Sequence, residues 1–151
     1  MNILILGDVM GSSGRKAIKK NLSKIINENE IDFTIINGEN AADDGKGITS
    51  SIAEEFFLQG VDVITSGNHI WDKKETTDYI NKEKRLLRPA NLLEDSPGNG
   101  YGIYLTVGRY KLILIYSFQP YQKVVCLCNQ QAKRFCLPKV PPGSIYCAFR
   151  S

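Results

Sequence analysis

Three short apolar runs in the first 65 residues are each followed directly by polar residues. Residues 2–7, 31–36 and 61–65 have the length of buried strands rather than of helices. Between the first two runs, residues 14–28 carry apolar side chains at the spacing of one helix face, at Ile18, Leu22, Ile25 and Ile26. The pattern predicts strand, helix and strand in turn.

Two capping-box pairs predict where two further helices begin. Ser51 and Glu54 have the required spacing before an apolar face, and Gly60 follows as the expected C-terminal stop. Asp72 and Glu75 repeat the spacing before a helix that runs through Asn81. The third apolar run lies between these two helices.

A hairpin is predicted after the turn-rich residues 88–100. Residues 101–107 and 110–115 are strand-like segments on either side of Gly108-Arg109. Strands that alternate with helices, followed by paired strands, indicate an α/β layered domain with a largely parallel sheet.

Length and hydropathy limit the class of protein. A chain of 151 residues fits one domain with a sizeable core. No apolar run approaches the roughly 18 residues of a membrane span. The start of the chain has no basic segment and contains Asp8, so it resembles a buried strand rather than a signal peptide. We expect a cytoplasmic protein without a membrane partner.

The composition changes abruptly near residue 116. All 16 acidic residues precede that point, whereas residues 117–151 carry five basic residues. The change predicts an N-terminal half-domain over 1–115 and an aberrant, poorly ordered tail over 116–151, of the kind that a frameshift produces. The basic charges follow no helical or strand period, so we expect no specific nucleic-acid partner.

The same tail contains every cysteine of the chain, at Cys126, Cys128, Cys136 and Cys147. Four cysteines can bind zinc, but these lack the usual paired spacing of zinc knuckles. Disulfides are not expected in a cytosolic chain. A cysteine-tailed binding module is an open alternative for this segment.

Polar residues follow each of the three predicted parallel strands. Asp8 follows the first, Glu39 and Asn40 the second, and Asn68 and His69 the third. Parallel strands end at one edge of a sheet, where ligands bind. Carboxylate and amide oxygens suit divalent cations, and histidine transfers protons near neutral pH.

Each residue alone also has a structural explanation. Asp8 is typical of a cap or a turn, Asn37 and Asn40 near Gly38 are typical of turns, and a single histidine is often only hydrogen-bonded. The segment 11–14 before a helix could hold a phosphate, but it matches neither the dinucleotide-binding motif nor the P-loop. The joint occurrence at three strand ends favours the metal hypothesis.

Over residues 1–115 the chain resembles the calcineurin-like metallophosphoesterases, and most of all their YmdB-type branch. The resemblance rests on five segments: Gly7-Asp8-Val9 with Gly11 and Gly14-Arg15, Asn37-Gly38-Glu39-Asn40-Ala41, Gly67-Asn68-His69 with Trp71-Asp72, Arg88-Pro89-Ala90-Asn91, and Pro97-Gly98-Asn99-Gly100. It implies a layered α/β sandwich of two sheets flanked by helices, here truncated to the N-terminal half. It also implies 2′,3′-cyclic nucleotide phosphodiesterase activity.

The resemblance further implies a dinuclear iron or manganese centre. Asp8 would bind one ion, Glu39 would bridge both, Asn40 would complete the first and Asn68 the second. His69 would donate a proton to the leaving oxygen. The family's second half supplies further histidines, and this chain has none after His69.

We therefore expect a metal-dependent phosphoesterase of small phosphodiesters or cyclic nucleotides, impaired by its incomplete ligand set. The alternative is a non-catalytic remnant that binds metal weakly or acts through contacts. A half-domain would expose apolar sheet surface and strand edges, so we also expect self-association.

Overall fold

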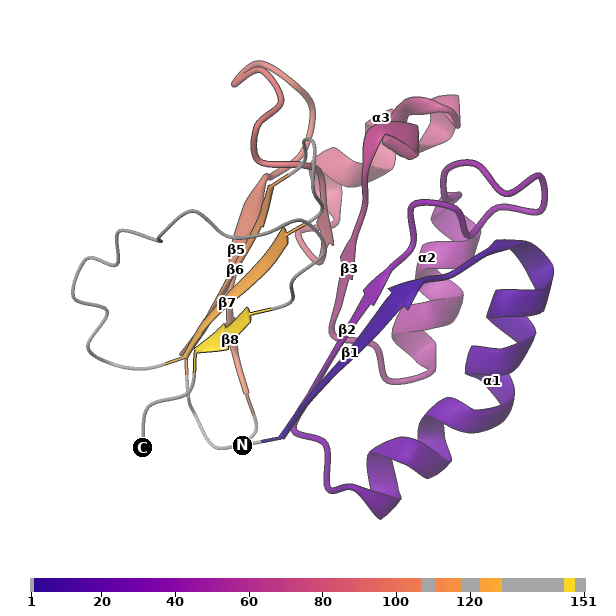
Figure 1. The fold of residues 1–151 in the computed structure, drawn as a ribbon. Helices are drawn as coiled ribbons and strands as arrows, with labels where there is room; N and C mark the ends of the chain where they lie inside the picture. The colour runs from indigo at the N-terminus through magenta and orange to yellow at the C-terminus, as the bar shows by residue number, and fades with distance from the viewer. Residues whose placement is uncertain (1, 107–110, 118–122, 129–145, 149–151) are drawn as a thin grey trace.

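The computed structural model describes residues 2–106, 111–117, 123–128 and 146–148. They form two sheets packed face to face, with helices on the outer side of the first (Figure 1). The first sheet has the order β1-β2-β3-β4, and all of its pairs are parallel. Its strands are β1 (Ile3–Asp8), β2 (Phe33–Asn37), β3 (Val63–Thr65) and β4 (Leu86–Leu87). The predicted α/β class is confirmed.

Two helices cover one face of this sheet and close the larger core. They are α1 (Gly11–Glu28) and α2 (Ser50–Leu58). Leu22 of α1 is 1% exposed and Phe56 of α2 is fully buried against the sheet. Burying such a side chain stabilises the fold by about 1.5–3 kcal/mol. The amphipathic face predicted from Ile18 and Leu22 is therefore the face that packs.

The second sheet is antiparallel except at its last pair. It has the order β5-β6-β7-β8, from β5 (Tyr101–Leu105), β6 (Lys111–Ser117), β7 (Lys123–Cys128) and β8 (Tyr146–Ala148). The antiparallel pairing of β5 with β6 confirms the predicted hairpin, whose turn lies outside the described residues. Tyr104 joins the sheets because its ring packs 5.8 Å from that of Phe33 in β2.

The boundary predicted at residue 115 falls inside β6, and β7 and β8 belong to the predicted tail. The remaining tail segments, 118–122, 129–145 and 149–151, lie outside the described residues, and so does Cys136. The expectation of a poorly ordered tail stays a prediction.

Both predicted capping boxes are wrong, although both helices exist. The Thr49 side chain caps α2 and accepts a hydrogen bond from the Ile52 backbone at 3.3 Å. Glu54 instead accepts a hydrogen bond from the Tyr79 hydroxyl of α3 (Lys74–Lys82). The N-cap of α2 is thus Thr49 and not Ser51. Glu54, the acid of the predicted capping box, binds the neighbouring helix α3 instead of the N-terminus of α2.

The predicted capping box at the start of α3 is also absent, because both of its acids bind other residues. The residue before the helix is Lys73, and its side chain forms no cap. Glu75 accepts hydrogen bonds from the backbone and hydroxyl of Ser50, each at 3.0 Å, and so joins the start of α3 to the start of α2. Asp72 contacts His69 instead. Gly60, by contrast, ends α2 as predicted, with φ +95°.

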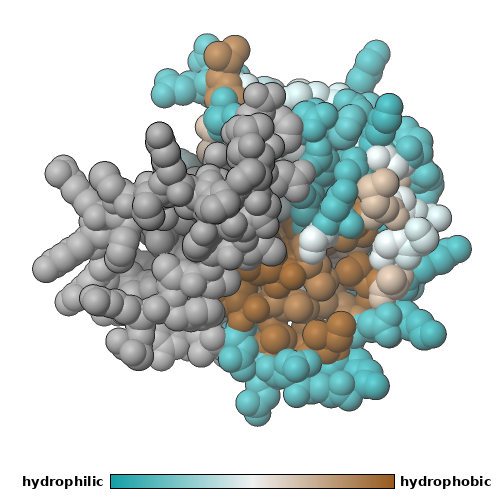
Figure 2. Space-filling model, in the orientation of Figure 1, coloured by the Kyte–Doolittle hydropathy of each residue, from teal (hydrophilic) through white to brown (hydrophobic). Residues whose placement is uncertain are grey.

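None of the helices in the described part of the chain has the length and apolarity that a membrane span requires. The apolar side chains of β1, at one end of the first sheet in the described residues, are only half-buried, and an apolar surface lies over this strand (Figure 2).

Candidate metal-binding edge of the parallel sheet

The parallel register brings the three polar segments to one edge. Asp8 is the last residue of β1 and pairs with Asn37, the last residue of β2. Asn37 in turn pairs with Thr65 at the end of β3. Glu39 and Asn40 follow β2 directly, and Asn68 and His69 begin the short 3₁₀ helix η1 (Asn68–Trp71) after β3. The shared edge is the one that the sequence predicts.

Asp8 and Asn40 are in direct contact. The Asn40 amide donates a hydrogen bond to Asp8 Oδ2 at 2.8 Å. The Asn40 carbonyl accepts one from the Gly11 backbone, also at 2.8 Å. The backbone of α1 thus holds Asn40 in place, and the donating amide leaves Oδ1 as the acceptor atom of that side chain.

Glu39 is the buried carboxylate of the edge, with 3% of its surface exposed. Backbone N–H groups of Asn68 and His69 donate to its carboxylate. Its own N–H donates to Asn37 Oδ1 at 2.9 Å. A Cβ atom at Gly67 would overlap both carboxylate oxygens, so the absence of a side chain there creates the space that Glu39 occupies.

The electrostatics show that this edge attracts positive charge. Burial raises the pKa of Glu39, and the nearby Asp8 carboxylate raises it further. His69 and the two backbone N–H groups oppose this effect. A carboxylate whose charge is destabilised in this way is stabilised by a bound cation.

His69 is oriented by a residue that our sequence analysis assigned to a cap. Its Nδ1 lies 2.7 Å from Asp72 Oδ2. This contact leaves Nε2 as the nitrogen available for proton transfer. The signal that could have revealed the pair is its i, i+3 spacing, which places both side chains on one face of a helical turn.

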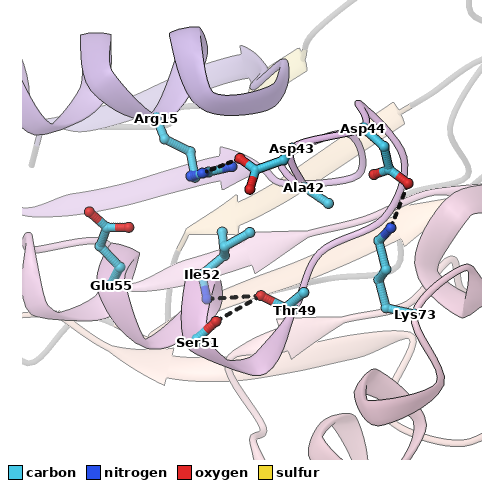
Figure 3. Close-up of a pocket in the computed structure, with 9 residues that line it drawn as sticks. All are labelled: Arg15, Ala42, Asp43, Asp44, Thr49, Ser51, Ile52, Glu55 and Lys73. Carbon is cyan, nitrogen blue, oxygen red and sulfur yellow. Dashed lines mark hydrogen bonds and ion pairs between the residues drawn. The ribbon is translucent and has the colours of Figure 1, made fainter.

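An adjacent pocket of about 550 Å³ lies between α1, α2 and the loop 42–49 (Figure 3). Four of its charged side chains form two pairs: Arg15 contacts Asp43 at 2.6 Å and Lys73 contacts Asp44 at 2.7 Å. Arg15 also donates to the Ala41 carbonyl, next to Asn40. These contacts fix the start of the loop, directly after Asn40, so the pocket residues support the edge rather than extend it.

The donor set fits part of a divalent-metal site. Asp8, Glu39 and Asn40 contribute oxygens of the kind that Mn²⁺ accepts, and the exposed Asn68 lies in η1 at the same edge. Within the described residues, no three His, Cys, Asp or Glu side chains lie close enough together to hold an ion. The described residues therefore supply fewer ligands than two ions require.

The chain is similar to several known proteins. A family model described as YmdB-like protein matches residues 4–126. A 2′,3′-cyclic-nucleotide 2′-phosphodiesterase of Bacillus subtilis is 50% identical over 100 residues, which are 66% of this chain and 38% of that protein. A Mycoplasma pneumoniae protein named as a phosphatase/phosphodiesterase is 38% identical over 92 residues, 61% of this chain and 32% of its own length.

Two solved structures share the fold. A protein from Thermus thermophilus aligns with a TM-score of 0.69 and 34% identity, covering 83% of this chain and 45% of that one. A phosphatase from Mycoplasma pneumoniae aligns with a TM-score of 0.64 and 30% identity, covering 82% and 41%. The chain spans less than half the length of each of these relatives.

Proposed function

The chain belongs to the YmdB-like protein family, and on that premise we propose that it takes part in metal-dependent hydrolysis of small phosphodiesters, with 2′,3′-cyclic nucleotides as the substrate class. The observation that carries the proposal is the meeting of Asp8, Glu39 and Asn40 at one sheet edge, beside an oriented histidine. The name of the Bacillus subtilis relative supports the substrate class.

In this proposal, the edge holds two divalent ions, iron or manganese. Asp8 and Asn40 would hold one ion, Asn68 would hold the other, and Glu39 would be shared by both. Such ions supply Lewis-acid chemistry that neutralises the phosphoryl oxygens of a bound phosphodiester. Glu39 is buried and its carboxylate accepts hydrogen bonds from backbone N–H groups, so its position does not depend on contacts with water.

His69 acts as the proton donor to the leaving oxygen. An alkoxide leaves poorly unless it is protonated as the bond breaks. Asp72 holds Nδ1 of the ring at 2.7 Å, which directs Nε2 away from the carboxylate. The proton therefore leaves from Nε2, and Asp72 acts only by positioning His69.

The test combines Mn²⁺ titration with hydrolysis of bis(p-nitrophenyl) phosphate and of 2′,3′-cyclic AMP by the 151-residue chain. We expect weak Mn²⁺ binding and slow, Mn²⁺-dependent hydrolysis. Glu39→Gln should abolish both, whereas Glu94→Gln, which removes an exposed carboxylate far along the chain, should change neither. Hydrolysis that is unaffected by both Mn²⁺ and Glu39→Gln would refute the proposal.

A second candidate is a metal-binding protein without turnover. It is favoured by the absence, among the described residues, of any group of three strong metal ligands. It predicts Mn²⁺ binding that Glu39→Gln removes, with no hydrolysis of either substrate by the unmodified chain.

A further inference from the structure

Two of the four cysteines are neighbours in the second sheet. Cys126 belongs to β7 and Cys147 to β8, and the parallel register of these two strands pairs them directly (Figure 1). The same register continues through one further pair on either side. The two cysteines are far apart in the chain, so their spacing matches no sequence motif. The sheet register brings together two thiol-bearing residues that the proposed function does not use.

Strand spacing favours this pair over the other cysteines of the sheet. Neighbouring strands lie about 4.7–4.9 Å apart, and a disulfide joins Cα atoms about 4.4–6.8 Å apart. Cys128 lies two residues further along β7, on the same face and about 6.6 Å from Cys126. The diagonal from Cys128 to Cys147 is about 8 Å, which exceeds the reach of a disulfide. Cys126 and Cys147 are therefore the pair best placed for a bond.

A pair of thiols suits oxidation better than zinc binding. A structural zinc site needs four ligands, and within the described residues no group of three His, Cys, Asp or Glu residues could hold an ion. A disulfide needs two thiols only. Residues 117–151 also carry five basic residues and no acid. Positive charge favours the thiolate, which is the reacting form of cysteine.

We propose that Cys126 and Cys147 form a redox-active dithiol that reacts with small disulfides and closes into a disulfide between β7 and β8. One cysteine thiolate attacks the small disulfide, forms a mixed disulfide and expels one thiolate. The other cysteine attacks the protein sulfur of the mixed disulfide and expels the second thiolate. Two protein thiols are thus oxidised, and one small disulfide is reduced to two thiols that take up the two protons. An excess of a small thiol reverses both steps.

The bond would fasten the last strand of the second sheet. In the described part of the chain, β8 ends the order β5-β6-β7-β8 and pairs with β7 alone. Three register pairs join β8 to β7, whereas six join β7 to β6. A disulfide also closes the chain between residues 126 and 147 into a loop, which lowers the entropy of the unfolded chain. Oxidation therefore stabilises the attachment of β8, and reduction weakens it.

This proposal is independent of the proposed function. The cysteine pair lies in the second sheet, whereas the candidate metal-binding residues lie at the edge of the first. A chain without hydrolytic activity would leave the thiol chemistry untouched. A chain without the disulfide would leave the proposed function untouched.

Peptide mapping of the 151-residue chain identifies the bond. The folded chain is incubated with glutathione disulfide, its remaining thiols are alkylated, and it is digested with trypsin. Trypsin should divide the four cysteines among three peptides: residues 124–133 with Cys126 and Cys128, 135–139 with Cys136, and 140–150 with Cys147. We expect the first peptide linked to the third, and the second alkylated. Dithiothreitol should restore all four thiols.

The same oxidation in denaturant is the reference for this experiment. Without the strand register, the three peptides should be linked in several combinations. Hydrogen–deuterium exchange measures the effect on the fold: the β8 amides should exchange more slowly in the oxidised chain than in the reduced chain. The amides of β3, in the other sheet, should not change.

A matched pair of variants separates the two cysteines of β7. Cys126→Ser removes the residue paired with Cys147 and should lower the yield of the linked peptides at least about tenfold, because Cys128 lies beyond bonding distance. Cys128→Ser removes the same thiol group from the same face of the same strand, two residues later, and should leave the yield unchanged.

Three results would overturn the proposal. The first is a folded chain whose linkages equal those formed in denaturant, or whose four thiols all remain free. The second is a yield that Cys126→Ser and Cys128→Ser lower equally, or that Cys128→Ser lowers more. The third is a disulfide that joins two chains, seen as a doubled mass without reductant, or one that leaves the exchange of the β8 amides unchanged.

Discussion

The carboxylate of Glu39 occupies the space that a side chain at Gly67 would fill. Gly67 has φ −140°, which other residues also adopt, so the constraint on this position is one of space and not of backbone conformation. The glycine after β3 therefore determines whether the acid after β2 can lie at the edge.

Gly67→Ala should displace Glu39 and destabilise the fold by about 1–3 kcal/mol, as overpacking of a buried site does. It should also lower the affinity for Mn²⁺. Denaturant unfolding and Mn²⁺ titration measure the two effects. Gly7→Ala is the control, because a Cβ atom there meets nothing within 4 Å, and it should be tolerated.

His69→Asn should lower turnover by about 10²-fold or more on ribose leaving groups, because general acid catalysis is lost. The loss should be smaller on nitrophenyl esters, whose leaving groups need little protonation. Mn²⁺ affinity should stay nearly constant. An equal loss on both substrate types would contradict the role of proton donor.

Asp72→Asn should reduce turnover less than His69→Asn while leaving the fold intact, since Asp72 acts through the ring at 2.7 Å. An amide at this position no longer holds the ring by the same contact, so Nε2 is less well directed. The loss should be larger on ribose leaving groups than on nitrophenyl esters, as for His69→Asn. An equal loss on both substrate types would show that Asp72 does not act through the proton donor.

Arg15→Gln should loosen the loop that carries Asn40. The guanidinium donates to the Ala41 carbonyl and to Asp43, and only 17% of its side chain is exposed. We expect a loss of about 1–2 kcal/mol in unfolding free energy together with weaker Mn²⁺ binding. Lys16→Gln, one residue later on the exposed side of α1, should change neither quantity.

Asp62 makes the stability depend on pH. Burial raises the pKa of its carboxyl above the ordinary value, although it accepts a hydrogen bond from the Thr34 backbone at 2.7 Å. Between the unfolded and folded pKa values the folded state binds more protons, so stability falls as the pH rises through that range. Asp62→Asn keeps an acceptor for Thr34 and removes the charge. The variant should therefore lose this pH dependence and be at least as stable at pH 7.

Thermal unfolding at several pH values tests this prediction. Asp62→Ala serves as the comparison, because it leaves the Thr34 N–H without its acceptor and should be less stable at every pH. An Asp62→Asn variant that is clearly less stable at pH 7 would show that the charge is favourable.

The sequence alone determined the elements whose signal is local. The three apolar runs became β1, β2 and β3, and the spacing of Ile18 and Leu22 identified the buried face of α1. The edge that gathers Asp8 and Glu39 also followed, because parallel strands necessarily end on the same side. The two-residue β4 was missed because so short a segment has no period to detect.

Only the tertiary structure decided which partners the polar side chains take. Glu54, Glu75 and Asp72 have capping-box spacing, yet they bind Tyr79, Ser50 and His69. A carboxylate can bind any donor within reach, and the packing of α2 against α3 brings donors from distant positions in the chain. The space that Gly67 leaves for Glu39 likewise exists because β2 and β3 lie side by side, and no local sequence pattern predicts this contact. Local periodicity thus determined the elements, and packing determined the contacts of the candidate site.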